Sequence, residues 1–336
     1  MSRSARKTVL LLALLALLGA VPAAIAAFAA TTSNSANSFA AAATFNDTLQ
    51  MATGGYTGDA VNGRTIAVGF QPDYVIVKAN GAQIGVARTS TMPVDYSKPM
   101  TGSTSLLPLR IRSFTGTGFT IGTDASVNTN LAAYSWVAFK ARPGVMKVGS
   151  YPGTGTAQSP ATTFSPDHVS VFGEGITRPV QRFTGMTTTF RYESSTGTAS
   201  AINSLDPTGF TVGTAAETNA ATSPALTYHY VAFNEVSGAV KRGSYVGNNT
   251  SNRPITGLGF QPGYVNIRAN DTATAREGHH RPASVSGTGS QFFSALANST
   301  TAITALGADG FTLGTNGAVN ASGPTYHYMA FKNTGG

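Results

Sequence analysis

Short alternations of apolar and polar residues run along most of the chain and predict β-strands. In YVIVKA (74–79), Val75 and Val77 fall on one face and Lys78 on the other, which is the period-two pattern of a half-buried strand. The segment GFTIGT (118–123) shows the same alternation after a turn. Because β-branched and turn residues are frequent and helix formers sparse, the pattern predicts an all-β protein without long helices.

Four landmarks recur three times in the same order, with a period of about 95 residues. They are a Gly-x-Tyr or Gly-Tyr opener, a strand after Ser-Pro or Gln-Pro, the string GFTxGT, and a closing aromatic strand. The openers contain Tyr56, Tyr151 and Tyr245. The closing strands are AYSWVAFK (133–140), TYHYVAFN (227–234) and TYHYMAFK (325–332). This period is too long for a solenoid repeat and suits a small domain.

We therefore expect three tandem antiparallel β-sandwich modules of jelly-roll-like type, after an N-terminal signal helix. The joints contain Pro143-Gly144 and Ser237-Gly238 and no flexible linker, which leaves a rod and side-by-side packing as alternatives. The expected division is a signal peptide at 1–26, a leader at 27–53, module 1 at 54–142, module 2 at 147–236 and module 3 at 241–333.

The N-terminus has the pattern of an export signal. Basic residues at positions 3–7 precede an apolar stretch that ends in Ala24-Ile25-Ala26, an A-x-A cleavage site, with 27–29 as a second choice. The alternative is an uncleaved membrane anchor. Because the strongly apolar run 9–21 is short for a span of roughly 20 residues, we expect cleavage. The protein is then secreted or held at the cell surface, without a stable membrane span.

The leader repeats the spacing of a module joint. Phe45 precedes Tyr56 by 11 residues, and Phe139 precedes Tyr151 by 12. Residues 31–48 therefore cap module 1, or pair with the sheet edge of another copy by strand addition, or form a polar leader without fixed structure. Strand addition would make the protein its own partner.

Composition narrows the classes of partner. The chain has no Cys, so the modules depend on burial and not on disulfides. Removal of Arg3, Arg6 and Lys7 with the signal lowers the formal net charge from +8 to about +5. The remaining basic residues are scattered, which suits polymers of the cell surface or matrix. A nucleic-acid groove needs clustered Lys and Arg, so we expect no nucleic-acid partner.

Catalytic and metal motifs are missing from the sequence. There is no G-x-S-x-G, H-E-x-x-H or Walker string, and no Cys nucleophile. Asp73 and Asp167 match in position, but Gly263 replaces them in module 3, so we interpret them as turn caps. His229 and His327 also match, yet no second ligand accompanies them. We therefore expect no enzyme, no metal and no cofactor.

His279 and His280 lie in the most divergent stretch of module 3. Adjacent residues on a strand face opposite ways, so this pair is a poor chelate. A solvated loop is the expected setting.

The closing strands are apolar on both faces. We assign the face that contains Val or Met and Phe to the core of each module. The aromatic face is then covered by a neighbour, or it is an exposed platform that stacks on sugar rings. The candidate ligand-binding residues are Tyr134, Trp136, Tyr228, Tyr230, Tyr326 and Tyr328.

Two resemblances follow from these strings. The leader AFAATTSNSANSFAAAATFNDT resembles the leaders of secreted biofilm-fibre and camelysin-type proteins. The modules, with GFQPDYVIVKA, DGFTLGT and YHYMAFK, resemble poorly characterised β-modules of bacterial secreted proteins and phage tail or fibre proteins. Module 2 departs from the pattern with TFSPDH. The resemblance implies no defined activity, and the export signal is not expected of a virion part.

Together these features predict a secreted structural or adhesive repeat protein of the cell surface or extracellular matrix, able to self-assemble. The alternative is a secreted, lectin-like protein that binds glycans through its aromatic strand faces or its variable loops.

Overall fold

The computed structural model describes residues 33–34, 37–38 and 49–334. The first two segments form β1 (Ser33–Asn34) and β2 (Asn37–Ser38), which pair antiparallel in an N-terminal unit. The second unit is compact and begins at Thr48. The predicted signal peptide lies outside the described residues, and so does the segment 31–48 apart from β1 and β2.

Module 1 consists of two antiparallel sheets. Its strands are β3 (Gln50–Thr57), β4 (Arg64–Ala67), β5 (Tyr74–Ala79), β6 (Val86–Thr89), β7 (Tyr96–Pro99), β8 (Leu107–Pro108), β9 (Ile111–Thr115), β10 (Gly118–Ile121) and β11 (Ala133–Lys140). The large sheet has the order β3-β11-β5-β6-β7-β8, and the small sheet has the order β4-β10-β9. A one-turn helix, α3 (Ala125–Asn128), precedes the closing strand β11.

Module 2 repeats this arrangement. Its elements are β12 (Met146–Pro152), β13 (His168–Gly173), β14 (Val180–Phe183), β15 (Phe190–Arg191), β16 (Ile202–Asp206), β17 (Gly209–Val212), α4 (Ala216–Asn219) and β18 (Thr227–Phe233). The large sheet has the order β12-β18-β13-β14-β15, and β16 pairs with β17 in the small sheet.

Module 3 repeats it again. Its elements are β19 (Val240–Val246), β20 (Arg253–Thr256), β21 (Pro262–Asn270), β22 (His279–Pro282), β23 (Gln291–Phe292), β24 (Ile303–Gly307), β25 (Gly310–Leu313), α5 (Gly317–Asn320) and β26 (Thr325–Lys332). The sheets have the orders β19-β26-β21-β22-β23 and β20-β25-β24. The all-β, antiparallel prediction is confirmed. The first strands begin one to four residues before the predicted module boundaries, and a one-turn helix precedes each closing strand.

The core of each module lies between its large and small sheets, and the aromatic face of the closing strand fills it. In module 1, Tyr134 and Trp136 are buried in a cluster with residues of both sheets. The ring of Phe119 on β10 meets Trp136 edge-on, with centroids 6.1 Å apart. Modules 2 and 3 have equivalent clusters. The assignment of the Phe-containing face to the module core is therefore wrong.

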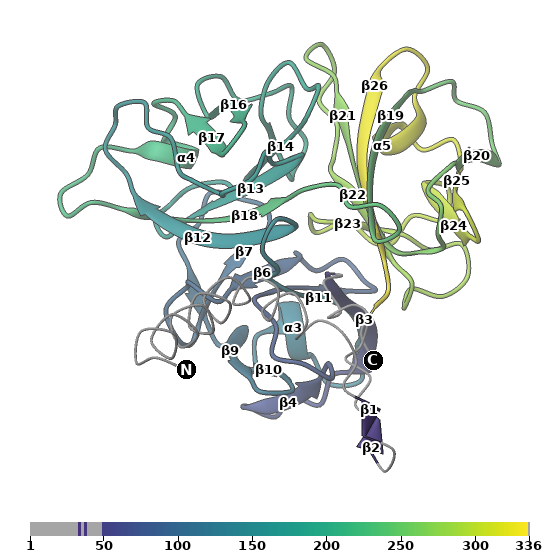
Figure 1. The fold of residues 1–336 in the computed structure, drawn as a ribbon, viewed down its shortest axis with the longest axis horizontal. Coiled ribbons are helices and arrows are strands. Elements are labelled where there is room, and N and C mark those ends of the chain that lie inside the picture. The colour runs from purple at the N-terminus through teal and green to yellow at the C-terminus, as the bar shows by residue number, and fades with distance from the viewer. Residues whose placement is uncertain (1–32, 35–36, 39–48, 335–336) are drawn as a thin grey trace, which may run out of the picture. The chain divides into compact units, whose positions relative to one another are not determined.

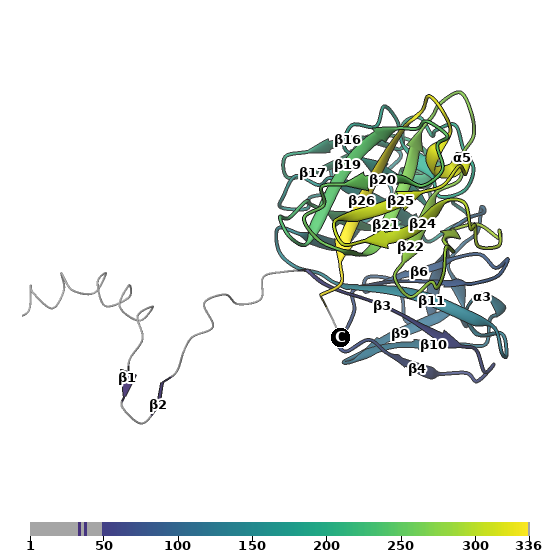
Figure 2. The same cartoon turned by 90° about the vertical axis from the view of Figure 1, so that its right-hand side faces the viewer.

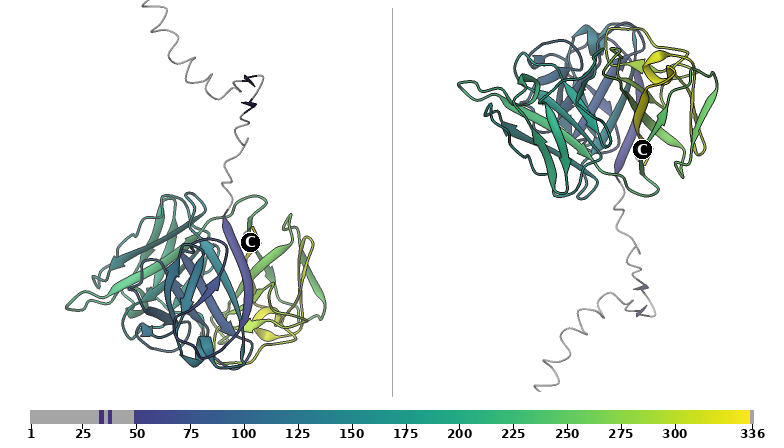
Figure 3. Two further views of the ribbon diagram at one scale, coloured as in Figure 1. Left: turned by 90° about the horizontal axis from the view of Figure 1, so that it is seen from below. Right: turned by 90° about the horizontal axis from the view of Figure 1, so that it is seen from above.

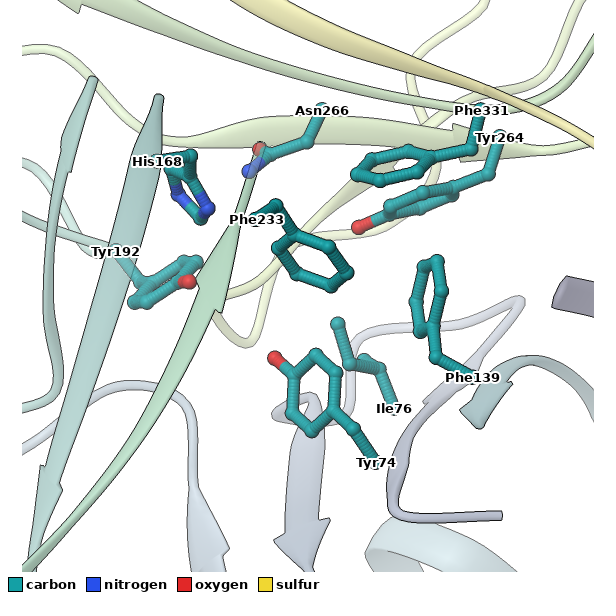
Figure 4. Close-up of a pocket in the computed structure, with 9 residues that line it drawn as sticks. All are labelled: Tyr74, Ile76, Phe139, His168, Tyr192, Phe233, Tyr264, Asn266 and Phe331. Carbon is teal, nitrogen blue, oxygen red and sulfur yellow. The ribbon is translucent and has the colours of Figure 1, made fainter. Parts of the chain in front are cut away.

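The Phe-containing faces of the three closing strands meet in one shared core (Figure 4). Phe139, Phe233 and Phe331 form a triangle whose ring centroids are 5.1, 5.1 and 4.9 Å apart. Large sheets with two apolar faces are buried on both sides. For the same reason β5 is wholly buried, not half-buried as its alternation suggested. The modules thus pack side by side and do not form a rod (Figures 1, 2 and 3).

A buried cation spans each of the three junctions between modules. Its side chain bonds to carbonyl or hydroxyl oxygens of the neighbouring module. The bonds are Lys98 Nζ to Gly173 O at 2.7 Å, Arg268 Nη2 to Ser195 Oγ at 2.9 Å, and Lys78 Nζ to Leu296 O at 3.3 Å. The contacts therefore run from module 1 to 2, from 2 to 3 and from 3 back to 1, which makes a closed ring.

The two ends of the ring meet without a covalent joint. The N–H of Thr334 donates to Met51 O at 2.9 Å, and the N–H of Met51 donates to Thr334 Oγ1 at 3.0 Å. Arg142 with Met146 forms the corresponding bridge at the first covalent joint. The end of module 3 therefore occupies the place before β3 that the spacing had given to the leader. Strand addition by the leader to another copy stays a prediction.

The glycine of each opener lies under an aromatic ring of the closing strand. These cross-strand pairs are Gly54 with Trp136, Gly149 with Tyr230, and Gly243 with Tyr328. A Cβ added at any of the three glycines would overlap that ring. The recurring Gly-x-Tyr or Gly-Tyr opener is therefore a packing requirement of the module core.

Gly149→Ala is expected to lower the free energy of unfolding by about 1–3 kcal/mol, because an added methyl group forces a well-packed core to shift. Tyr230 cannot move aside, since it is buried against Phe210. Urea unfolding measures the effect, and Gly116→Ala is the control because a Cβ there meets nothing within 4 Å. Equal stability of the two variants would contradict this packing.

Candidate functional site

The six aromatic residues predicted as a ligand platform are all buried, with exposed fractions between 0 and 6%. The first tyrosine of each closing strand holds the one-turn helix of its module. Tyr134 Oη accepts from the N–H of Thr129 and donates to Ala125 O, both at 2.8 Å. Tyr228 and Tyr326 make the same bonds to α4 and α5. These rings are covered by their own module and do not reach the surface as a sugar platform.

A buried asparagine at the end of each one-turn helix was missed by the sequence analysis. Asn128 Nδ2 donates to Gly122 O at 2.9 Å, and its Oδ1 accepts from the N–H of Asp59 at 2.9 Å. Asn219 and Asn320 make equivalent bonds. The signal was present, because an asparagine follows the last glycine of GFTxGT by six residues in all three modules. These bonds fasten the chain around the one-turn helix.

All five histidines of the chain are buried, with exposed fractions of 0 to 7%. The expectation of a solvated loop for His279 and His280 is wrong, because β22 pairs with β21 on one side and β23 on the other. The ring of His280 stacks on Phe293 with centroids 4.1 Å apart. Among the residues that the structure describes, no cluster of three or more His, Cys, Asp or Glu side chains is arranged to hold a metal ion.

The matching histidines of the closing strands lie at the junctions. At the junction of modules 1 and 2, His229 Nδ1 lies 2.8 Å from Thr91 Oγ1, and its Nε2 lies 3.0 Å from Glu174 Oε1. Burial lowers the pKa of His229, although Glu174 opposes this effect. Nδ1 therefore joins the two modules, and Nε2 is bonded within module 2.

The junction of modules 3 and 1 is joined by other side chains at the same place. Ser135 replaces the histidine, and its hydroxyl donates to Asn80 Oδ1 at 3.1 Å. Gln291 of module 3 donates to the same oxygen at 3.1 Å. This junction is also closed by hydrogen bonds.

The junction of modules 2 and 3 differs, because a cleft of about 150 Å³ opens there. Gly185 stands where module 1 has Thr91, just after the strand that follows β13 and β5 respectively. The residues that line the cleft include Asp167, Thr184, Arg242, Ser244, His327 and Tyr328. We take this cleft as the candidate functional site.

An ion pair forms one wall of the cleft. Arg242 Nε donates to Asp167 Oδ1 at 2.8 Å, and Asp167 Oδ2 accepts from the N–H of Glu235 at 2.8 Å. Asp73 accepts from the N–H of Ala141 in the same way. The aspartates therefore cap the backbone just after the closing strand, rather than their own turn.

His327, which is 7% exposed, also lines the cleft. Burial lowers its pKa, the backbone of Thr184 opposes this, and the charge of Arg242 lowers the pKa further. The ring is therefore neutral at pH 7 and can donate one hydrogen bond and accept another.

The centre of the shared core contains a small cavity, which Figure 4 shows among its lining rings. Its volume is about 10 Å³, which is room for roughly one water molecule. Phe139, Phe233 and Phe331 line it together with Tyr74 and His168. It is part of the core and too small for an organic ligand.

Module 3 has a wider and more open hollow of about 470 Å³ on its small sheet. Hydroxyl and amide side chains dominate its lining. They include Asn252, Thr288, Thr300, Thr301, Thr304 and Thr312. Such a surface offers hydrogen-bond donors and acceptors without charge.

Residues 180–334 match a family described as a domain of unknown function, DUF7483. The match begins at β14 and runs through module 3, so it includes most of the cleft. No curated protein matches the chain. No helix within the described part of the chain is long and apolar enough to cross a membrane.

Proposed function

We propose that the protein is a secreted structural or adhesive protein of the cell surface or extracellular matrix. The observation that carries this proposal is the single shared core, which joins three repeats into one body without disulfides. A large apolar interface of this kind restricts motion between modules. The stretches that differ among the modules can then present different surfaces from one stiff support.

The N-terminus supports export, and the resemblance to bacterial surface and fibre modules supports the same place of action. A net charge of about +5 after signal removal supports contact with acidic polymers of a cell wall or matrix. Self-assembly through residues 31–48 is part of this proposal.

The chain from residue 27 onward is expected to bind cell-wall or matrix polymers saturably. Retention on insoluble polysaccharide, peptidoglycan and intact cells measures this, with heat-unfolded protein as the control.

Deletion of residues 31–48 tests self-assembly in sedimentation experiments. Strictly monomeric protein at high concentration would contradict assembly, and the absence of saturable retention on every polymer and cell would contradict adhesion.

The second candidate is a lectin-like glycan-binding protein. The uncharged, hydroxyl-lined hollow of module 3 and the cleft between modules 2 and 3 favour it, because concave sites with a few placed polar groups are typical binding sites. The buried aromatic faces no longer support it. A glycan array on the mature chain separates the candidates, since a structural protein shows no preference among defined sugars.

A further inference from the structure

We infer that the cleft between modules 2 and 3 is a binding site for a neutral, polyhydroxylated ligand of the size of one sugar unit. This inference rests on the lectin-like form of the proposed function and deepens it, because it names the site and the ligand class. The three junctions between modules place different residues at matching positions.

The cleft exists because module 2 has no side chain at the position where Thr91 of module 1 fills the corresponding space. At the junction of modules 1 and 2, the hydroxyl of Thr91 bonds the ring of His229. At the matching position, Gly185 has φ +86° and no side chain, and a Cβ there would lie 3.0 Å from Cε1 of His327. Any other residue at position 185 would strain the backbone, and its side chain would crowd the His327 ring. The edge of the His327 ring therefore faces open space.

Three polar groups converge on that space. Arg242 uses its Nε for Asp167, and its terminal nitrogens Nη1 and Nη2 make no hydrogen bond to any described residue. Ser244 lies two residues along β19, which puts it on the same side of this edge strand. His327 completes the set from the neighbouring strand β26.

Apolar surface closes the rest of the cleft. Phe183 lines it next to Gly185 and Gly243, and Tyr328 lines it from β26 although its ring packs into the core of module 3. A sugar ring presents hydroxyl groups at its rim and C–H groups on its faces, so it can use both kinds of wall. Few other common ligands combine these surfaces at this size.

The charge of the cleft favours a neutral ligand. Asp167 accepts from Arg242 and from two further donors, the N–H of Glu235 and, at 3.3 Å, Thr184 Oγ1. The carboxylate of Glu235 pairs with Lys241 at 2.6 Å. The charges around the cleft therefore cancel, and neither an anion nor a cation is favoured. The volume of about 150 Å³ lies below the roughly 300–1,000 Å³ of sites for drug-sized ligands.

The experiment uses the full mature chain and titrates it by NMR with glucose, galactose, mannose and N-acetylglucosamine, and with galacturonic acid as a charged probe. We expect at least one neutral sugar to shift the His327 ring signals saturably, and to bind more tightly than the acid. Arg242→Val is expected to weaken that sugar about tenfold or more, because it removes charged donors. Valine is the residue that module 2 has there, at Val148.

Val246→Ala is the matched control, because Val246 lies on the same edge strand β19, is 56% exposed and does not line the cleft; it is expected to bind as the parent does. A second variant, Ser244→Phe, fills the cleft from an exposed edge strand and is expected to abolish binding without loss of thermal stability. Parent-like affinity in both Arg242→Val and Ser244→Phe overturns the site. A stronger response to galacturonic acid overturns the ligand class.

The outcome is separable from that of the proposed function. If the parent is retained on polymers and both cleft variants are retained equally, adhesion stands and this site is wrong. If no neutral sugar shifts any signal while polymers still retain the chain, the lectin-like form fails and the structural form stands. If nothing is retained and no sugar binds, both are rejected.

Discussion

Phe233→Ala is expected to lower the free energy of unfolding by about 3–5 kcal/mol and to weaken all three modules together. Phe233 is 3% exposed, and its ring lies 5.1 Å from that of Phe139 in module 1 and 4.9 Å from that of Phe331 in module 3. The truncation opens a cavity where the three modules meet. The lost packing therefore belongs to no single module.

The chain offers a direct way to test this. Its single Trp, Trp136, lies in the core of module 1, whereas the substitution is in module 2. In urea, the fluorescence of Trp136 should shift to a lower midpoint by the same amount as the circular dichroism of the whole chain. Val246→Ala, at a position that is 56% exposed, should change neither. An unchanged Trp136 transition in Phe233→Ala would falsify the shared core.

Acidification from about pH 6.5 to pH 4 is expected to destabilise the fold steeply. Burial lowers the pKa of His168 to about 4 and that of His279 to about 3, and it also lowers the pKa values of His229, His280 and His327. In this pH range the histidines are protonated in the unfolded chain but stay neutral in the folded chain. The free energy of unfolding therefore falls as the pH falls, by about 1.4 kcal/mol per pH unit for His168 and for His279.

His168 alone accounts for about 3 kcal/mol between its ordinary pKa and pH 4. Its ring is fully enclosed in the shared core, where it packs on Phe183 with centroids 4.3 Å apart. Urea midpoints measured from pH 7.5 to 4 give the slope, and His168→Gln should reduce it while keeping the bond to Gln181 within reach. A flat profile above pH 4.5, or ring signals that titrate near pH 6.5 in the folded protein, would show that these rings reach solvent.

The period-two alternation and the repeats were sufficient to predict the all-β, antiparallel class and the three closing strands. They could not say which apolar face belongs to which core. Phe139 and Tyr134 are both large and aromatic, so hydrophobicity does not distinguish them. Lys78 and Arg268 suggested a solvent-facing side, but their long side chains reach the carbonyls of Leu296 and Ser195 across a junction. A charged residue in a strand pattern is thus compatible with full burial when its donors find oxygens.

The three junctions differ because the repeats differ. The residues that make these differences come largely from the segments between the second and third landmarks, where the repeats diverge most. Lys98, Ser195 and Leu296 come from those segments, and each makes a different junction. The divergence therefore reflects three unlike interfaces, which only the assembled ring defines. Gly185 is uninformative in the sequence because turn glycines are common. The effect of Gly185 becomes clear only in the structure, where it lies beside His327 at the position that Thr91 occupies in module 1.

The bridge between Met51 and Thr334 limits how far a chain of such rings can extend. Met51 and Thr334, close to the two ends of the ring, lie side by side. In a tandem array of such rings, each ring would therefore branch off the connecting chain at one point and would add almost nothing to the end-to-end length of the array. The same geometry permits the whole ring to be spliced into a loop of another protein with little disturbance to either. Any long filament built from this protein must therefore gain its length from contacts between the outer faces of rings, or from the leader, and not from the covalent path through the modules.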